Sequence, residues 1–104
     1  MLKKGLCETC PLFFSALSNP ARLAILELLR DGPRNVTQIS EALEQDQSMI
    51  SHNLKPLIRC SFVSVEKRWR EHVYSINEET LEAIFQIFDN HAGKYCPEGR
   101  ECLT

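Results

Sequence analysis

The alternation of hydrophobic and polar positions along this chain predicts four helices, a β-hairpin and a last helix. The clearest pattern lies in residues 46–60, where hydrophobic side chains recur at the spacing of one helix face. These hydrophobic positions are Ile50, Leu54, Leu57 and Ile58. The polar positions on the opposite face are Ser48, His52, Lys55 and Arg59. The pattern is typical of a helix with one face in a core and one facing a polar partner, and equally of an ordinary surface helix.

The N-terminal turns of this helix carry short polar side chains. Asp46 is expected to cap the helix, because its carboxylate can accept hydrogen bonds from the backbone N–H groups of the first turn. Gln47, Ser48 and Ser51 would then project from the first turns. Side chains of this kind at a helix N-terminus fit the major groove of DNA. Pro56 lies inside the helix, where it removes one backbone hydrogen bond and is expected to bend or loosen the helix.

Two further helices are predicted in the first third of the chain. Residues 9–17 are expected to form a short helix with hydrophobic side chains on nearly all sides, which predicts burial on two sides. Asn19 followed by Pro20 is a typical helix start, a cap and then proline at the first helical position. We expect this second helix over residues 21–30, and residues 31–33, Asp-Gly-Pro, to end it. Its predicted core residues include Leu23, Leu26 and Leu29.

The third helix is predicted to lie close before the helix over residues 46–60. Thr37 is expected to cap it, and Leu43 to be its last residue. Its predicted inward-facing residues are Ile39, Ala42 and Leu43. Only Glu44 and Gln45 then precede Asp46. So short a connection fixes two helices at a steep angle, as in a helix-turn-helix.

After Cys60 the pattern changes to the alternation typical of strands. The hydrophobic residues of the two predicted strands are Phe62, Val63 and Val65, then Val73, Tyr74 and Ile76. Residues 66–71 form the mostly charged tip of the predicted β-hairpin. Asn77 is expected to cap a last helix that ends at Gly93. The predicted fold is therefore mainly α with a small β-hairpin wing, a winged helix-turn-helix of order α-α-α-α-β-β-α.

The length and composition of the chain predict its number of domains and its location. A chain of 104 residues, 43% of them hydrophobic, can build one modest core, which association with a second chain would help. We expect one domain over residues 1–104, with residues 94–104 as a cysteine-containing tail. Because no hydrophobic leader or membrane-spanning run is seen in the sequence, a soluble cytoplasmic protein without a membrane partner is expected.

The formal net charge of −2 conceals a positive segment. Residues 46–70 carry five basic and two acidic side chains, a net charge of +3. These are Lys55, Arg59, Lys67, Arg68 and Arg70 against Asp46 and Glu66. Positive charge gathered on one helix and the hairpin after it suits a phosphate backbone, although such a cluster can also be only a solvated face.

Two segments resemble the ArsR/SmtB family of winged-helix repressors. Residues 16–29, ALSNPARLAILELL, are similar to the family's opening pattern ALADPTRLRIL, and residues 48–57, SMISHNLKPL, are similar to its recognition-helix pattern SxVSxHLxxL. The resemblance covers roughly residues 12–90. It implies a homodimer, built from the first and last helices, that binds an inverted-repeat operator in double-stranded DNA. Where the family usually has Ala-Gly, this chain has Cys60 and Ser61, so the left-handed position that glycine fills must be handled otherwise.

The resemblance also assigns roles to the polar residues. It implies that Gln47, Ser48, Ser51 and His52 approach base edges or phosphates. Lys55 adds a positive charge to the same helix face, and the wing arginines Arg68 and Arg70 would reach the minor groove or the DNA backbone. An enzyme is not expected, because Ser51 and His52 are about 100° apart on a helix and do not make a nucleophile and base pair.

Four of the five cysteines lie near the two ends of the chain: Cys7, Cys10, Cys96 and Cys102. Because the family packs its first and last helices together, the resemblance implies that these thiolates could converge on zinc or cadmium, and three of them on arsenite. A thiol-disulfide switch, an iron–sulfur site and inert thiols are the alternatives. Cys60 is instead predicted to be a small core residue.

Two other metal sites of the family match poorly. Asn35 and Thr37 stand where some members have cysteines, and Asp89 with His91 matches only half of the last-helix zinc site. The predicted function is a dimeric repressor whose operator binding is relieved by a thiophilic metal or metalloid. A redox-sensing repressor and a winged-helix protein-interaction module with structural zinc are the alternatives.

Overall fold

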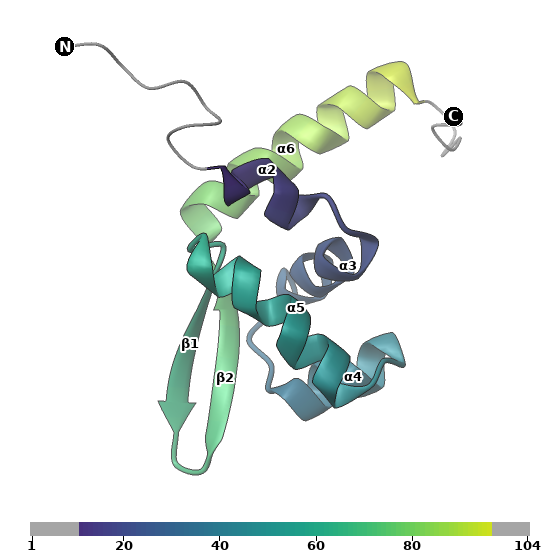
Figure 1. The fold of residues 1–104 in the computed structure, drawn as a ribbon. Coiled ribbons are helices and arrows are strands. Elements are labelled where there is room, and N and C mark those ends of the chain that lie inside the picture. Colours follow the sequence, from purple (N-terminus) through teal and green to yellow (C-terminus); the bar gives the residue numbers. More distant parts are fainter. Residues whose placement is uncertain (1–10, 97–104) are drawn as a thin grey trace, which may run out of the picture.

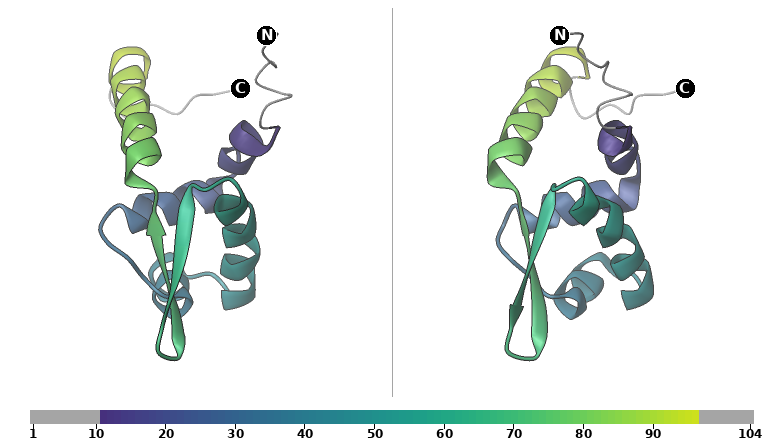
Figure 2. Two further views of the ribbon diagram at one scale, coloured as in Figure 1. Left: turned by 90° about the vertical axis from the view of Figure 1, so that its left-hand side faces the viewer. Right: turned by 60° about the vertical axis from the view of Figure 1, so that its left-hand side comes forward.

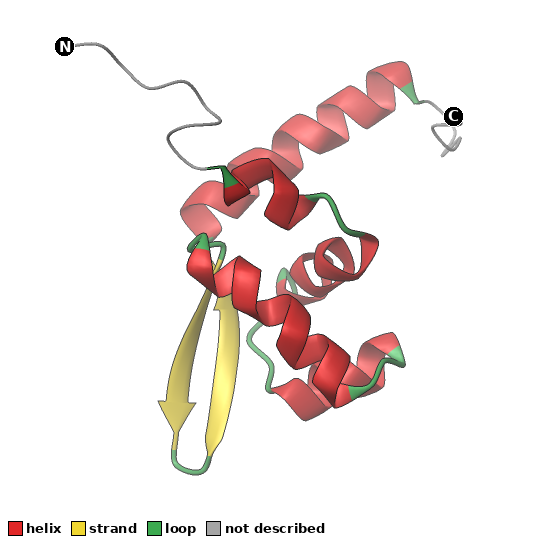
Figure 3. Ribbon diagram, viewed as in Figure 1, coloured by secondary structure: helices red, strands yellow, loops and turns green. Residues whose placement is uncertain are grey.

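The computed structural model describes residues 11–96, which form five helices and one β-hairpin (Figure 1). Figure 3 shows the same view with helices and strands in separate colours. This arrangement confirms the predicted mainly α fold with a hairpin wing. The elements are α2 (Leu12–Leu17), α3 (Pro20–Leu29), α4 (Val36–Leu43), α5 (Gln47–Arg59), β1 (Val63–Arg68), β2 (Glu71–Ile76) and α6 (Glu78–Tyr95).

Two asparagine caps predicted from the sequence are confirmed. The side chain of Asn19 accepts hydrogen bonds from the backbone N–H groups of Ala21, at 2.8 Å, and Arg22, at 3.2 Å. The side chain of Asn77 accepts one from the N–H of Thr80 at 3.4 Å. Each cap satisfies donors that a helix N-terminus otherwise leaves unpaired, so the starts of α3 and α6 are determined locally.

The predicted cap of α4 was wrong. Asn35, not Thr37, is the cap: its side chain accepts from the N–H of Gln38 at 2.8 Å, and its own N–H donates to the Gln38 side chain at 2.9 Å. This reciprocal pair satisfies two backbone groups at once, which starts the helix earlier. Asp46 does occupy the cap position of α5, but its side chain makes no capping hydrogen bond.

The predicted end of α6 at Gly93 was also wrong. The helix continues through Gly93 to Tyr95, and the N–H of Cys96 donates to the carbonyl of Ala92 at 2.7 Å. Pro56 lies inside α5, and the helix continues past it from residue 47 to residue 59.

The core gathers around α5 and the start of the hairpin. Its fully buried members include Ile50, Leu54 and Leu57 of α5 and Phe62 just after it. The ring of Phe62 meets the ring of Phe13 edge to face, with centroids 5.1 Å apart. Burial of these side chains is the main favourable contribution to folding of so small a domain.

Two predicted core positions are exposed. Leu23 is 46% exposed and Ala42 is exposed, so each faces solvent on its helix, and Ile25 takes the core position of α3 instead. The expected burial of α2 on two sides does not occur within one chain, since only Ala16 of that helix is buried and Phe14 is 63% exposed.

The hairpin is tighter than predicted. Its antiparallel register runs from the pair Val63 and Ile76 to the pair Arg68 and Glu71, so the loop is only two residues long. Trp69, the first loop residue, has a φ of 58°. A left-handed φ is usual at this point of a two-residue loop, but glycine, asparagine or aspartate normally supplies it.

Two backbone features join the hairpin to the helices. Ser61 has a φ of 62°, so it takes the left-handed conformation at the end of α5 in place of a glycine. Arg34, in the loop before α4, pairs with Tyr74 of β2 through N–H to carbonyl distances of 3.1 and 2.8 Å. The hairpin is thereby tied to both helices of the helix-turn-helix.

The C-terminal half of α6 extends away from the rest of the described chain (Figures 1 and 2). Leu81 and Phe85 in its first turns are buried, whereas in residues 86–95 every residue except the half-buried Ala92 is exposed. The two views of Figure 2 show α2 and α6 on the same side of the molecule but separated from one another.

Candidate nucleic-acid interface

The exposed face of α5 carries the polar residues that the sequence singled out. The structure exposes Gln47, Ser48, Ser51, His52 and Lys55, while Ile50 and Leu54 on the opposite side are buried. No aspartate or glutamate lies within α5. The helix therefore presents hydrogen-bonding groups near its N-terminus and positive charge farther along, a combination suited to base edges and phosphates.

The turn between α4 and α5 fixes the orientation of this face. Glu44 ends α4 in the left-handed conformation, with a φ of 55°. The hydroxyl of Ser40 donates to the carbonyl of Gln45, and the side-chain amide of Gln47 donates to the hydroxyl of Thr37 at 3.3 Å. These contacts couple the exposed end of α5 to α4, as the predicted helix-turn-helix requires.

A partly buried polar pair, missed in the sequence, holds α5 against α3 and α2. Asn53 is only 4% exposed, and its carbonyl oxygen accepts from Nε of Arg22 at 3.1 Å. Nη1 of Arg22 also donates to the backbone carbonyl of Ser15 at 3.3 Å, and the Asn53 amide donates to the carbonyl of Met49 at 3.0 Å. One arginine thus links three helices. The polar Asn53 among the hydrophobic positions of α5 was the only signal in the sequence.

A basic hollow of about 430 Å³ opens beside this pair. It is lined by Leu12, Ser15, Arg22, His52, Lys55, Pro56 and Arg59, with no carboxylate among them. The ion pairs found within residues 11–96, Glu27 with Arg30 and Glu66 with Arg68, involve none of these cations. The positive charge of the hollow is therefore available to an anion such as a phosphate.

The wing places its cations at the tip of the hairpin. Arg68 donates to the carboxylate of Glu66 at 3.0 and 3.1 Å, an exposed contact that orients its guanidinium. The guanidinium of Arg70 lies 4.8 Å from the ring centroid of Trp69. Figure 1 shows the hairpin loop and the N-terminal end of α5 at the same end of the molecule, opposite the ends of α2 and α6.

The proposed cysteine site lies mostly outside the described residues. Cys7, Cys10 and Cys102 fall there, and Cys96, half-buried, is at the C-terminal cap of α6. In residues 11–96 no group of three or more His, Cys, Asp and Glu side chains could hold a metal ion. Asp89 and His91 are exposed on α6. Cys60 is half-buried against the hydrophobic core, which confirms its predicted place.

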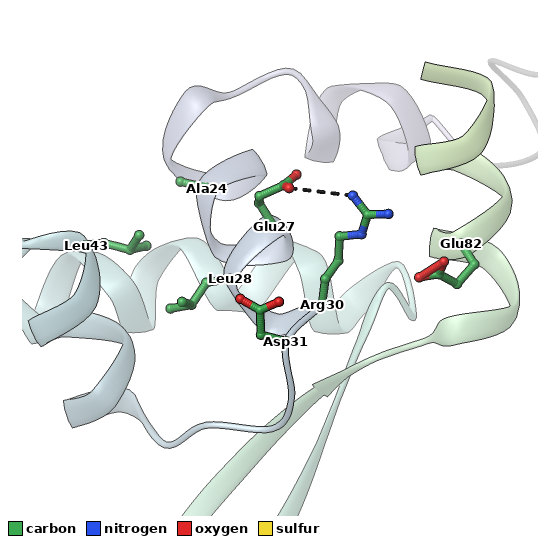
Figure 4. A pocket seen from close by; sticks show the side chains of 7 residues that line it. All are labelled: Ala24, Glu27, Leu28, Arg30, Asp31, Leu43 and Glu82. Carbon is green, nitrogen blue, oxygen red and sulfur yellow. Dashed lines mark ion pairs between the residues drawn. The ribbon is translucent and has the colours of Figure 1, made fainter. Parts of the chain in front are cut away.

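A second hollow, of about 640 Å³, lies between α3, α4 and α6 (Figure 4). Figure 4 shows Arg30 reaching toward Glu27, at 3.5 Å, with Asp31 and Glu82 nearby. The Arg30 guanidinium also stacks on Phe85, 4.2 Å from its centroid. Acidic groups outnumber this one arginine and no residue of α5 or the hairpin lines the hollow, so it does not extend the basic surface.

Comparison with known proteins identifies the family to which this chain belongs. The sequence model of the bacterial regulatory proteins of the arsR family matches residues 19–65. The HTH-type transcriptional regulator NmtR of Mycobacterium tuberculosis is 37% identical over 83 residues, 75% of this chain and 69% of the relative. The chain belongs to the arsR family. The resemblance seen in the sequence is thereby confirmed.

Further members agree with this assignment. The arsenical resistance operon repressor of Staphylococcus xylosus is 36% identical over 73 residues, 70% of each chain. The solution structure of a homodimeric winged helix-turn-helix DNA-binding domain from Mycobacterium bovis, a possible ArsR-family regulator, matches with a TM-score of 0.79, 25% identity and full coverage of both chains. As an arsR-family protein, the chain is a DNA-binding transcriptional regulator and not an enzyme. Within the described residues, none of the helices combines the length and the hydrophobicity needed to span a membrane.

Proposed function

We propose that this arsR-family chain is a cytoplasmic, homodimeric repressor that binds an inverted-repeat operator and releases it when its cysteines bind a thiophilic metal or metalloid. The observation that carries the proposal is the exposed face of α5, polar at its N-terminal end, basic farther along and free of carboxylates, with a basic hairpin tip at the same end of the molecule. An interaction module for proteins alone would not need positive charge on both elements.

In this proposal α5 enters the major groove by its N-terminal end. Gln47, Ser48 and Ser51 read base edges, because short side chains at that end reach the floor of the groove. His52 and Lys55 contact phosphates, helped by the basic hollow beside them. Arg68 and Arg70 hold the neighbouring backbone or minor groove. Specificity and affinity thus come from different residues.

The dimer of the proposal forms through α2 and α6. Exposed hydrophobic side chains on these helices include Leu12, Phe14, Ile87, Phe88 and Tyr95. Large exposed hydrophobic surfaces are typical of interaction sites. The homodimeric state of the structural relative from Mycobacterium bovis supports a dimer. Two copies related by a twofold axis would place their α5 helices about 34 Å apart, one turn of DNA.

The cysteine site of the proposal combines Cys7, Cys10, Cys96 and Cys102. Thiolates are the ligands that soft ions such as zinc, cadmium and trivalent arsenic prefer, and the relative from Staphylococcus xylosus is named for arsenical resistance. The bound ion would supply a crosslink between thiolates. Cys96 itself follows directly on α6, the proposed dimer helix, so an ion held there would act on the spacing of the two α5 helices.

The DNA contacts can be tested by the salt dependence of binding. Arg68→Ala and Arg70→Ala should weaken binding to all sequences and flatten the slope of log affinity against log salt by about one unit per lost phosphate contact. Gln47→Ala and Ser51→Ala should instead reduce the discrimination between operator and random DNA. Fluorescence anisotropy with a duplex from the region upstream of the gene measures both quantities.

A charge control separates these effects from net charge. Lys94→Ala removes one positive charge from α6, away from the proposed DNA-contacting surface, and should leave the salt slope unchanged. If the four alanine variants of α5 and the wing bind DNA like the parent, the assigned surface is wrong.

The metal response is expected to be an affinity change of about 5- to 150-fold, the usual range of allosteric coupling. Operator affinity should fall when zinc, cadmium or arsenite is added under reducing conditions. The variant Cys96→Ser/Cys102→Ser should lose this response, whereas Cys60→Ala, a matched control in the core, should keep it. By reciprocity, DNA should weaken ion binding by the same factor.

Three results would redirect the proposal. Equal operator affinity with and without every ion would reject metal sensing. Tighter DNA binding by the ion-loaded parent would reverse the proposed direction. Release of DNA by a thiol oxidant, with no effect of any ion, would favour the redox-sensing alternative.

A further inference from the structure

We propose that Trp69, at the tip of the wing, packs its indole against the sugar edges of the DNA minor groove beside each half-site. This inference rests on the proposed function and adds to it a contact made by a hydrophobic side chain. Trp69 is 83% exposed, more than the other large hydrophobic side chains exposed within residues 11–96. The ring therefore contributes almost nothing to the core of its own chain.

The backbone at Trp69 gives no structural reason for a tryptophan. Arg68 and Glu71 form the last pair of the hairpin, so Trp69 is the first residue of a two-residue loop. Its φ of 58° lies in the left-handed region that favours glycine. A bulky side chain is a rare choice at such a position. Neither packing nor turn geometry accounts for the indole, which leaves recognition of a partner.

The charges around the ring indicate the chemistry of that partner. Lys67 and Arg68 precede the loop, and Arg70 is its second residue, with a guanidinium 4.8 Å from the ring centroid of Trp69. Both nearby carboxylates are already engaged: Glu66 pairs with Arg68, and Glu71 accepts from the Asn35 side chain at 3.2 Å. A flat hydrophobic ring with a guanidinium stacked on it can contact a deoxyribose with the ring and the neighbouring phosphate with the guanidinium.

The position of the loop favours the minor groove over a protein surface. The hairpin loop and the N-terminal end of α5 lie at the same end of the molecule in Figures 1 and 2. When α5 lies in the major groove, the wing beside it faces the adjoining backbone and minor groove. Arginines and hydrophobic wedges are the side chains that minor-groove proteins use there.

The chain contains a single tryptophan, so its fluorescence reports on this loop alone. We would measure the emission spectrum and the acrylamide quenching of the full chain, with and without an unlabelled duplex selected by the protein from a random library. Binding would be followed separately by anisotropy of a labelled copy. Quenching should fall about threefold or more when the duplex saturates the protein, because DNA then covers the ring.

The two measurements distinguish failure of this inference from failure of the proposed function. Binding seen by anisotropy, with unchanged quenching, would overturn the contact at Trp69 and leave the DNA-binding function intact. If no duplex is selected or bound at all, the proposed function fails and this inference fails with it.

A variant and a modified duplex test the position of the ring. Because glycine suits the left-handed φ, the urea concentration at the midpoint of unfolding should be the same for Trp69→Gly as for the parent, or higher. The operator affinity of Trp69→Gly should fall about fivefold or more. Val65→Ala, an exposed hydrophobic residue of β1 away from the loop, serves as the control and should bind normally.

Replacing adenine by 2,6-diaminopurine in the base pairs flanking the half-sites adds an amino group to the minor groove and leaves the major groove unchanged. The parent should bind this duplex more weakly than the unmodified duplex. Trp69→Gly should bind the two duplexes with equal affinity. Equal losses for both proteins would place the ring outside the minor groove.

Discussion

Replacing Phe62 with alanine is expected to lower the free energy of unfolding by about 3–5 kcal/mol. The side chain is 1% exposed and stacks edge to face on Phe13. Its backbone N–H donates to the carbonyl of Leu57 and its carbonyl accepts from the N–H of Asn77, both at 2.9 Å. The cavity would therefore open where α5, the hairpin and α6 meet. Small domains have only about 5–15 kcal/mol of stability, so a large part of it would be lost.

Urea unfolding followed by circular dichroism measures this change. Protein concentration must be the same for parent and variant, because a dimer that forms only when folded makes stability depend on concentration. Met49→Ala, which truncates a side chain 46% exposed near the N-terminal end of α5, should stay within about 0.5 kcal/mol of the parent. A loss for Phe62→Ala no larger than for Met49→Ala would contradict the central place of Phe62 in the core.

Replacing Phe88 with aspartate is expected to abolish the dimer at micromolar concentration and to lower operator affinity by about a hundredfold or more. Phe88 is 63% exposed on the part of α6 that extends from the core, so the monomer should fold normally. In a dimer built from α2 and α6, the new carboxylate would be buried without a partner. Each α5 would then bind its half-site alone.

Sedimentation measures the oligomeric state, and anisotropy with the full operator measures the affinity. Asn90→Asp is the matched control: it adds the same charge two residues along α6, on the other side of the helix, and should leave the dimer intact. A Phe88→Asp protein that still sediments as a dimer would show that this face is not the interface. Unchanged far-UV circular dichroism would confirm that the variant is folded.

The pattern of hydrophobic positions predicted the order of elements and the faces of α5 because that helix has one clear hydrophobic side. It failed for α3, where hydrophobic residues occupy nearly all positions and the period cannot choose a face. Leu23 was placed in the core for this reason, and Ile25 was overlooked. For α4, Thr37 was predicted as the cap, and Asn35 caps the helix instead through its reciprocal contact with Gln38, which joins side chains three residues apart.

The dimer hypothesis changes in one respect. The first and last helices carry four phenylalanines, Phe13, Phe14, Phe85 and Phe88, but Phe13 stacks on Phe62 and Phe85 is buried under Arg30. Phe14 and Phe88 remain for a partner. The sequence alone could not separate the buried phenylalanines from the exposed ones, because burial depends on which face each helix packs against its neighbours. The link from Arg22 to Asn53 joins residues 31 positions apart and was invisible for the same reason.

Asn77 anchors the start of α6 to the segment between α5 and β1. Its N–H donates to the carbonyl of Phe62, its side-chain amide donates to the carbonyl of Ser61 at 3.0 Å, and its side-chain oxygen caps α6. The start of α6 is thus held at the base of the wing. Since 18 helical residues span about 27 Å, a tilt of about 10° at Asn77 displaces the far end by roughly 5 Å. A displacement at the Cys96 end of α6 would therefore reach the junction between α5 and β1 through the contacts of Asn77 with Ser61 and Phe62.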